Sequence, residues 1–186
     1  MFHIKNDKRS QSSSQAIYQG LISLSKQRPF NSITVSAICE ESKVSRATFY
    51  RNFDIIEDIF MWRIDEISKD ILDKYQGRPE HQKDMTFNRF LMRIGFEHYE
   101  LLKALNDAHR LDLIENAIRH FIEMYGLTAV QKIDSKLLKY ALASKIGSFF
   151  GILECWINNE QDLDLNAFLD NLDKITEIAE DLTIVL

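Results

Sequence analysis

Residues 33–53 read ITVSAICEESKVSRATFYRNF, and their pattern is the most informative in the chain. Thr34 and Ser45 each precede a short predicted helix, and a hydroxyl at that position can accept a hydrogen bond from an unpaired backbone N–H of the first turn. Between the two helices, Ser42-Lys43-Val44 is predicted to form a tight turn. Two short capped helices joined by such a turn predict a helix-turn-helix.

The second of these helices, residues 45–51, carries side chains that suit DNA. It offers hydroxyl groups, two guanidinium groups and a phenol, and Ala47 is small enough to permit a close approach. In a helix-turn-helix the second helix enters the major groove. The alternative is that residues 34–53 form an ordinary pair of core helices. Against it, Arg46 and Arg51 stand in one short helix and neither repeats a burial stripe.

The remaining sequence predicts an all-α protein. Only two prolines and six glycines occur among 186 residues, and apolar residues recur at helical spacing, as at Ile17, Leu21 and Leu24. Several amphipathic helices joined by short links predict a helical bundle. The predicted helices span residues 10–26, 34–41, 45–51, 54–76 (ended by Gly77 and Pro79), 87–105, 111–125, 134–158 and 164–182.

The charge is distributed unevenly between the two parts of the chain. Residues 1–53 hold eight Lys and Arg against three Asp and Glu, whereas residues 54–186 hold 15 basic and 25 acidic residues. A basic N-terminal module on an acidic body favours a DNA reader carried on a helical scaffold. We therefore expect a DNA-binding domain at residues 1–53 and a second helical domain at residues 54–186.

Several classes of protein are disfavoured by what the sequence lacks. Cys39 and Cys155 are too far apart for a disulfide framework, and no stretch has the length and apolarity of a membrane span or signal peptide. No nucleophile motif, glycine-rich phosphate loop or spaced set of metal ligands is present. The sequence therefore predicts a cytoplasmic protein that is not an enzyme and needs no cofactor or metal.

The segments Ile33–Glu40 and Val44–Phe53, with the preceding helix and the Arg28-Pro29-Phe30 break, resemble the DNA-binding domain of TetR/AcrR-family transcriptional regulators. The resemblance covers residues 9–65, and it implies double-stranded DNA as a partner. It implies that Thr34 contacts a phosphate and that the second helix faces the groove. The DNA-binding residues expected on these grounds are Thr34, Lys43, Ser45, Arg46, Ala47, Thr48, Tyr50, Arg51 and Asn52.

The sequence departs from the family pattern at two places. The turn has Lys43 where family members usually have glycine, so a lysine is expected at a positive φ, with modest strain. Residues 54–57 read DIIE where family members often carry a lysine that contacts phosphate. The lost contact is expected to weaken DNA affinity or to shift it onto Lys5, Lys8 and Arg9.

A strip of small residues in the helix of residues 134–158 suggests a dimer interface. Ala143, Gly147 and Gly151 recur every four residues, which would let another helix come close. The resemblance implies a homodimer in which the last two helices of each subunit form the interface, adding Phe168, Leu172 and Ile175. The alternative is close packing within one chain.

An effector pocket is implied by the resemblance alone. Its candidate residues are Phe60, Phe90, Ile94, His98, Leu101, Phe121, Tyr125 and Trp156. An aromatic stripe is more often plain core, and a histidine on an apolar face is more often a satisfied core residue than a ligand contact.

The resulting hypothesis is a repressor that binds a palindromic operator as a dimer and responds to an effector, although the residues themselves do not decide between repressor and activator. The alternative is a helical protein-docking module, or an activator controlled by a partner protein instead of a small ligand.

Overall fold

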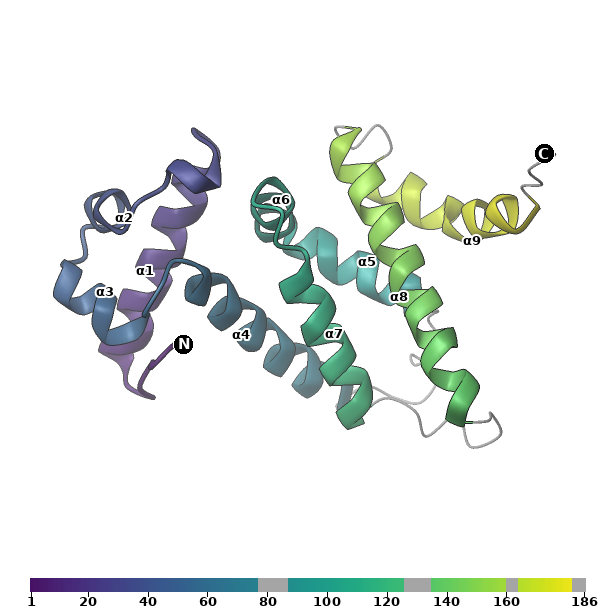
Figure 1. The fold of residues 1–186 in the computed structure, drawn as a ribbon, viewed down its shortest axis with the longest axis horizontal. Coiled ribbons are helices and arrows are strands. Elements are labelled where there is room, and N and C mark those ends of the chain that lie inside the picture. Colours follow the sequence, from purple (N-terminus) through teal and green to yellow (C-terminus); the bar gives the residue numbers. More distant parts are fainter. Residues whose placement is uncertain (77–86, 126–134, 160–163, 182–186) are drawn as a thin grey trace. The chain divides into compact units, whose positions relative to one another are not determined.

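The computed structural model describes residues 1–76, 87–125, 135–159 and 164–181, and in these it contains nine α-helices and no β-strand (Figure 1). The prediction of an all-α fold is confirmed. The helices are α1 (Lys8–Ser25), α2 (Val35–Ser42), α3 (Arg46–Asn52), α4 (Glu57–Gln76), α5 (Phe87–Glu97), α6 (Tyr99–Asp107), α7 (Asp112–Tyr125), α8 (Ser135–Asn158) and α9 (Leu165–Asp181), with a short 3-10 helix η1 (Phe30–Ser32) between α1 and α2.

Contacts along the chain divide it into two compact units. The first comprises Met1–Gly77 and Glu100–Ala129, and the second comprises Arg78–Tyr99 and Val130–Leu186. Helices α1 to α4, α6 from Glu100 onward and α7 thus belong to the first unit, while α5, Tyr99, α8 and α9 belong to the second. The domain boundary predicted after residue 53 separates DNA binding from dimerisation and effector binding, and it stays a prediction. No helix among the described residues is long and apolar enough to cross a membrane.

The helix starts follow from side-chain caps. Thr34 accepts a hydrogen bond from the Ala37 N–H (3.2 Å), and Ser45 accepts one from Thr48 (3.2 Å), so both predicted caps are confirmed. The first helix begins two residues earlier than predicted, at Lys8, because the Asp7 carboxylate caps it through the Ser10 N–H (2.8 Å). Asp164 caps α9 as predicted, whereas the predicted cap Asp134 and the predicted stops Gly77 and Pro79 lie outside the described residues.

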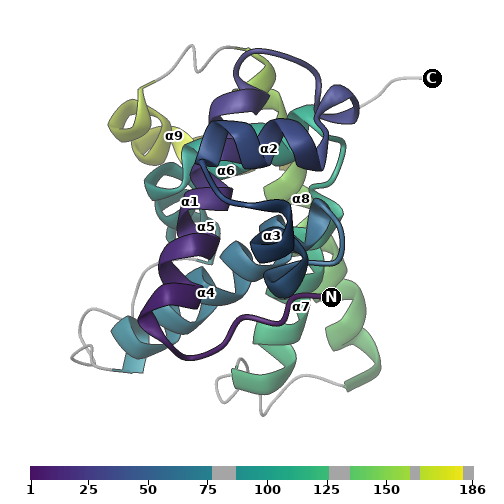
Figure 2. The ribbon, with the colours of Figure 1, turned by 90° about the vertical axis from the view of Figure 1, so that its left-hand side faces the viewer.

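Helices α2 and α3 both pack against α1 (Figure 2), and the side chains of α1 supply much of the core between them. Its predicted stripe of Ile17, Leu21 and Leu24 is buried. Glycine at position 20 lets α2 approach closely, since a Cβ there would lie 3.1 Å from Ser42 Cβ and 3.3 Å from the Ile38 carbonyl oxygen. The ring of Phe53 contacts those of Phe49 (5.9 Å) and Trp62 (6.0 Å), which joins the end of α3 to α4.

The helix predicted over residues 87–105 is two helices. The chain leaves α5 after Glu97 and starts α6 at Tyr99, with His98 in the turn between them. An apolar stripe with gaps of three and four residues can continue across two helices, because spacing indicates which face is buried and does not indicate where one helix ends and the next begins.

The second unit has an aromatic centre. Trp156 of α8 is buried, and its ring lies 5.5 Å from that of Phe168 in α9, 6.2 Å from Phe96 and 5.9 Å from Tyr99. Leu153 and Leu172 are also buried in this unit. The buried faces of α8 and α9 therefore pack within one chain.

Candidate nucleic-acid interface

The turn between α2 and α3 sets the direction in which α3 leaves α2. Lys43 adopts a left-handed conformation (φ 56°, ψ 31°), and the N–H of Val44 donates to the Cys39 carbonyl (3.0 Å). Such a left-handed residue closes α2 by satisfying its last carbonyls. The positive φ predicted for this lysine is confirmed, and an L-residue there costs roughly 1–2 kcal/mol relative to right-handed backbone.

One face of α3 is buried and the other is open. Phe49 is fully buried, whereas Tyr50 keeps 49% of its surface exposed while its ring packs edge-on against Phe49 (5.4 Å). The hydroxyl groups of Ser45 and Thr48 are hydrogen-bonded to each other (3.0 Å) at the start of the helix. Seven of the predicted DNA-binding residues are exposed and an eighth, Thr48, is half-buried; the exposed ones are Thr34, Lys43, Ser45, Arg46, Ala47, Tyr50 and Arg51.

The basic side chains of this face have no acidic partners among the described residues. Elsewhere in the chain, Arg110 forms an ion pair with Asp112 (2.9 Å) and Arg119 forms one with Glu115. None is found in the described part of the chain for Arg46, Arg51 or Lys43. Cations without a carboxylate partner are available to neutralise phosphates. The predicted auxiliary residues Lys5, Lys8 and Arg9 are also exposed.

Asn52 differs from the other predicted DNA-binding residues because its side chain is buried. It is only 2% exposed, and its amide donates to Ser13 Oγ (3.0 Å) while its Oδ1 accepts from Ser10 Oγ (3.2 Å). The side chain therefore ties α3 to α1 and has no free surface to offer DNA. Its sequence position, one residue after the exposed Arg51, lies on the inward face of the helix.

An N-terminal arm beside α3 was not foreseen from the sequence. Phe2 forms an isolated antiparallel bridge with Phe53, and the His3 N–H donates to the Asn52 carbonyl (2.8 Å). Two strand-like residues are too few to give a periodic signal in the sequence. The arm follows the C-terminal end of α3 (Figure 2).

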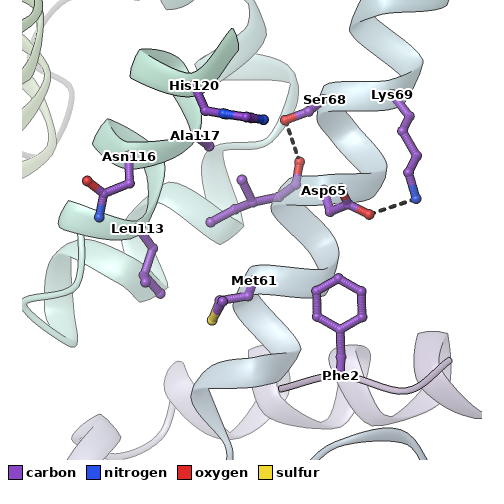
Figure 3. Close-up of a pocket in the computed structure, with 10 residues that line it drawn as sticks. Phe2, Met61, Asp65, Ser68, Lys69, Leu113, Asn116, Ala117 and His120 are labelled. Atoms are coloured by element: carbon purple, nitrogen blue, oxygen red, sulfur yellow. Dashed lines mark hydrogen bonds and ion pairs between the residues drawn. The ribbon is translucent and has the colours of Figure 1, made fainter. Parts of the chain in front are cut away.

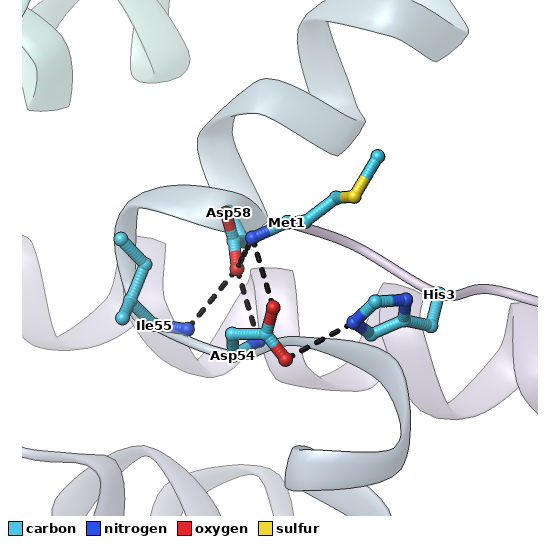
Figure 4. Close-up of polar contacts among 5 residues, drawn as sticks. All are labelled: Met1, His3, Asp54, Ile55 and Asp58. Atoms are coloured by element: carbon cyan, nitrogen blue, oxygen red, sulfur yellow. Dashed lines mark hydrogen bonds and ion pairs between the residues drawn. The ribbon is translucent and has the colours of Figure 1, made fainter.

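The arm is fixed by carboxylates at the start of α4 (Figure 4). The Met1 amine donates to the buried Asp58 (2.7 Å) and lies 3.1 Å from Asp54 Oδ2, while His3 Nε2 lies 3.0 Å from Asp54 Oδ1. The bond to Asp58 raises the pKa of the amine, and the bond from the amine lowers the pKa of the Asp54 carboxyl. Asp58 also accepts from the backbone N–H groups of Asp54 and Ile55. Asp54 and Asp58 thus hold the arm.

The predicted effector residues are divided between the two units. Phe60 and Leu101 are buried in the first unit, where Phe60 stacks on Phe30 (5.5 Å). In the second unit Trp156 is buried, and Ile94 and His98 are half-buried. The side chains of the other three, Phe90, Phe121 and Tyr125, lie outside the described residues. The pocket formed by this set stays a prediction.

The predicted dimer residues fall into two groups. Ala143, Gly147 and Gly151 are exposed on α8, and a Cβ added at either glycine would meet no atom within 4 Å. By contrast, Phe168 and Leu172 are buried within the second unit, and Ile175 is half-buried. In a single chain the small residues of α8 are therefore exposed, whereas the apolar residues of α9 are largely buried within the second unit.

A family model matches the part of the chain that contains the interface. Residues 17–61 match the model of bacterial regulatory proteins of the tetR family, and this match runs from the middle of α1 through α2 and α3 into α4. No curated protein and no solved structure matches the chain.

Proposed function

We propose that this chain is a repressor that binds a palindromic operator as a dimer and leaves it when an effector binds. The proposal starts from the family match: the N-terminal domain belongs to the tetR family of bacterial regulatory proteins, so the chain is a DNA-binding transcription regulator. Residues 1–53 bind DNA in this proposal, and residues 54–186 dimerise and take the effector. The observation that carries it is the face of α3, where Arg46, Tyr50 and Arg51 are exposed and the two arginines have no ion pair among the described residues.

The proposed contacts follow from the chemistry of that face. Arg46, in the first turn of α3, has the planar fork that binds guanine edges, and each such contact contributes roughly 1–3 kcal/mol of discrimination. Thr34 and Lys43, the exposed residues at the two ends of α2, contact phosphates in this proposal, together with Ser45, Thr48 and Arg51. Binding should therefore weaken steeply as salt rises.

The first experiment is a titration of the protein against the DNA upstream of its own gene and against a scrambled DNA, at two salt concentrations. Arg46→Ala and Tyr50→Ala should each weaken binding to the upstream DNA about tenfold or more, since tenfold corresponds to about 1.4 kcal/mol. The matched control is Arg119→Ala, an arginine in α7 that is already paired with Glu115. Equal weak binding to both DNAs, unchanged in the variants, would contradict the proposal and favour a protein-docking role.

The dimer is supported by the open strip on α8. Beside the exposed glycines, Leu137 and Tyr140 keep 61% and 65% of their surface exposed, so this helix presents an apolar face with room for a second helix. Half-site recognition by two copies suits a single short recognition helix. Gly147→Lys should convert the dimer into a monomer in sedimentation experiments, whereas Ser12→Lys on the exposed surface of α1 should not. A monomeric unmodified protein would contradict this part of the proposal.

A further inference from the structure

A groove runs between α4 and α7 in the first unit (Figure 3). Its volume is about 540 Å³, which lies within the range of small-molecule sites. Phe2 of the N-terminal arm lies at one end and His120 at the other, with Met61 and Leu113 between them. None of the residues predicted from the sequence to bind an effector lines this groove.

The walls of the groove are apolar side chains that the protein leaves partly uncovered. Met61 keeps 42% of its surface exposed, and Leu113 and Ala117 are half-buried opposite it on α7. The thioether of a methionine and the ring of a phenylalanine both pack favourably against aromatic rings. Phe2 and Met61 therefore suit the flat face of an aromatic molecule.

The rim of the groove supplies polar groups without net charge. Asp65 and Lys69 form an ion pair (2.7 Å), and the Ser68 hydroxyl donates to the Ile64 carbonyl (2.8 Å), so these groups are already satisfied. Asn116 and His120 are exposed, and within the described part of the chain neither has a hydrogen-bond partner. A ligand with one hydrogen-bonding group can use them, and the paired rim charges favour a molecule that is itself uncharged.

The groove is also connected to the recognition helix. Phe2, which lines it, is bridged through its backbone to Phe53, the residue that ends α3. The next residue of the arm, His3, bonds the Asn52 carbonyl. A molecule that displaces the Phe2 ring therefore acts on the backbone that holds the end of α3.

We propose that the groove between α4 and α7 binds an uncharged aromatic molecule carrying a hydrogen-bonding group, and that Phe2 transmits its binding to α3. The second clause rests on the proposed function, because it needs α3 to bind DNA. Differential affinity of the ligand for two positions of the arm would change DNA affinity by the same factor.

The probe for the site is N-phenyl-1-naphthylamine, an uncharged aromatic amine whose fluorescence increases in apolar surroundings. It is titrated into the full chain without DNA. Ala117→Phe, which fills the groove, and Met61→Gln, which makes one wall polar, should each weaken probe binding at least fivefold. The matched control is Ile55→Gln, a similarly exposed apolar residue of the same unit that does not line the groove. Circular dichroism spectra check that each variant is folded.

The transmission is tested by repeating the DNA titration with saturating probe. Operator affinity should fall in the unmodified protein and stay unchanged in Phe2→Ser, which keeps the backbone of the arm but removes the ring. Probe binding that is absent, or equal in all variants, overturns the site whether or not the protein binds DNA. Probe binding at the groove in a protein that binds no DNA supports the site and contradicts the proposed function. Probe binding with unchanged operator affinity overturns the transmission.

Discussion

The face of α3 and the face of α8 are both exposed strips on helices, but they differ in what lies behind them and in what they offer. Behind the exposed arginines and Tyr50 of α3 lie the packed rings of Phe49 and Phe53, and Ser45 caps the start of the helix. The exposed glycines of α8, by contrast, border open space. The α3 strip is cationic and polar, and the α8 strip is small and apolar. The proposed DNA surface meets a uniform polyanion, so its chemistry can be predicted from one chain, whereas the proposed dimer surface depends also on how two copies of the chain are oriented.

The largest expected effect is on the free energy of unfolding, when an aromatic residue behind the α3 strip is compared with one on the α8 strip. Phe49→Ala removes a fully buried ring from behind the α3 strip and should lower the free energy of unfolding by about 3–5 kcal/mol. Tyr140→Ala removes an exposed ring of α8 and should change it by no more than about 0.5 kcal/mol. Urea denaturation, at a protein concentration low enough to keep the chain monomeric, measures both. Similar losses in the two variants would mean that the α8 face is packed within the chain.

A pair of glycines sharpens the same contrast. Gly20→Val pushes α1 and α2 apart and should cost about 1–3 kcal/mol of stability, because the nearest atoms include helix backbone. Gly147→Ala adds a methyl group to open space and should stabilise an isolated chain by up to about 1 kcal/mol through helix propensity. Thermal unfolding of dilute samples tests both signs. Destabilisation of the dilute monomer by Gly147→Ala would break the contrast.

Two neighbouring residues of α3 should separate stability from DNA affinity. Asn52→Ala removes the two hydrogen bonds that join α3 to Ser10 and Ser13 and should cost about 1–3 kcal/mol of stability, with little change in the DNA affinity of the folded protein. Arg51→Ala should weaken DNA binding and leave stability unchanged. Denaturation and fluorescence-anisotropy titration are run on both variants. A DNA-specific loss in Asn52→Ala would restore the prediction that this residue contacts DNA.

The smallest expected effect is at the turn. Lys43→Gly relieves the left-handed strain and should stabilise the domain by about 1 kcal/mol. If the ammonium group contacts a phosphate, the slope of log affinity against log salt should become shallower by about one. A salt series on the two proteins measures this slope. An unchanged slope would remove Lys43 from the DNA-contacting residues.

The predicted features that appear in the structure are those set by short-range chemistry. Thr34, Ser45 and Asp164 cap helices because a side-chain oxygen satisfies a backbone N–H three residues away, which spacing alone reveals. The left-handed conformation of Lys43 was predicted from the family resemblance, because family members usually have glycine in this turn. The family match over residues 17–61 includes Thr34, Lys43 and Ser45 and does not extend to Asp164.

The features that were missed depend on contacts between distant residues. Asn52 bonds Ser10 and Ser13 across 42 and 39 positions, and Asp58 bonds the Met1 amine across 57. A polar residue held in this way has no local signature that separates it from one that faces a ligand. The break at His98 was missed for a different reason: the apolar periodicity continues from one helix into the next.

The clasp at Met1 has a practical consequence for handling the protein. A purification tag fused ahead of this residue would convert the amine into an amide, and Asp58 would lose a charged partner within 2.7 Å. The carboxylate would then remain buried beside the end of α3 with only backbone donors. DNA affinities measured on a chain tagged at this end would include that disturbance, so recombinant protein is better tagged at the other end or freed of its tag before Met1.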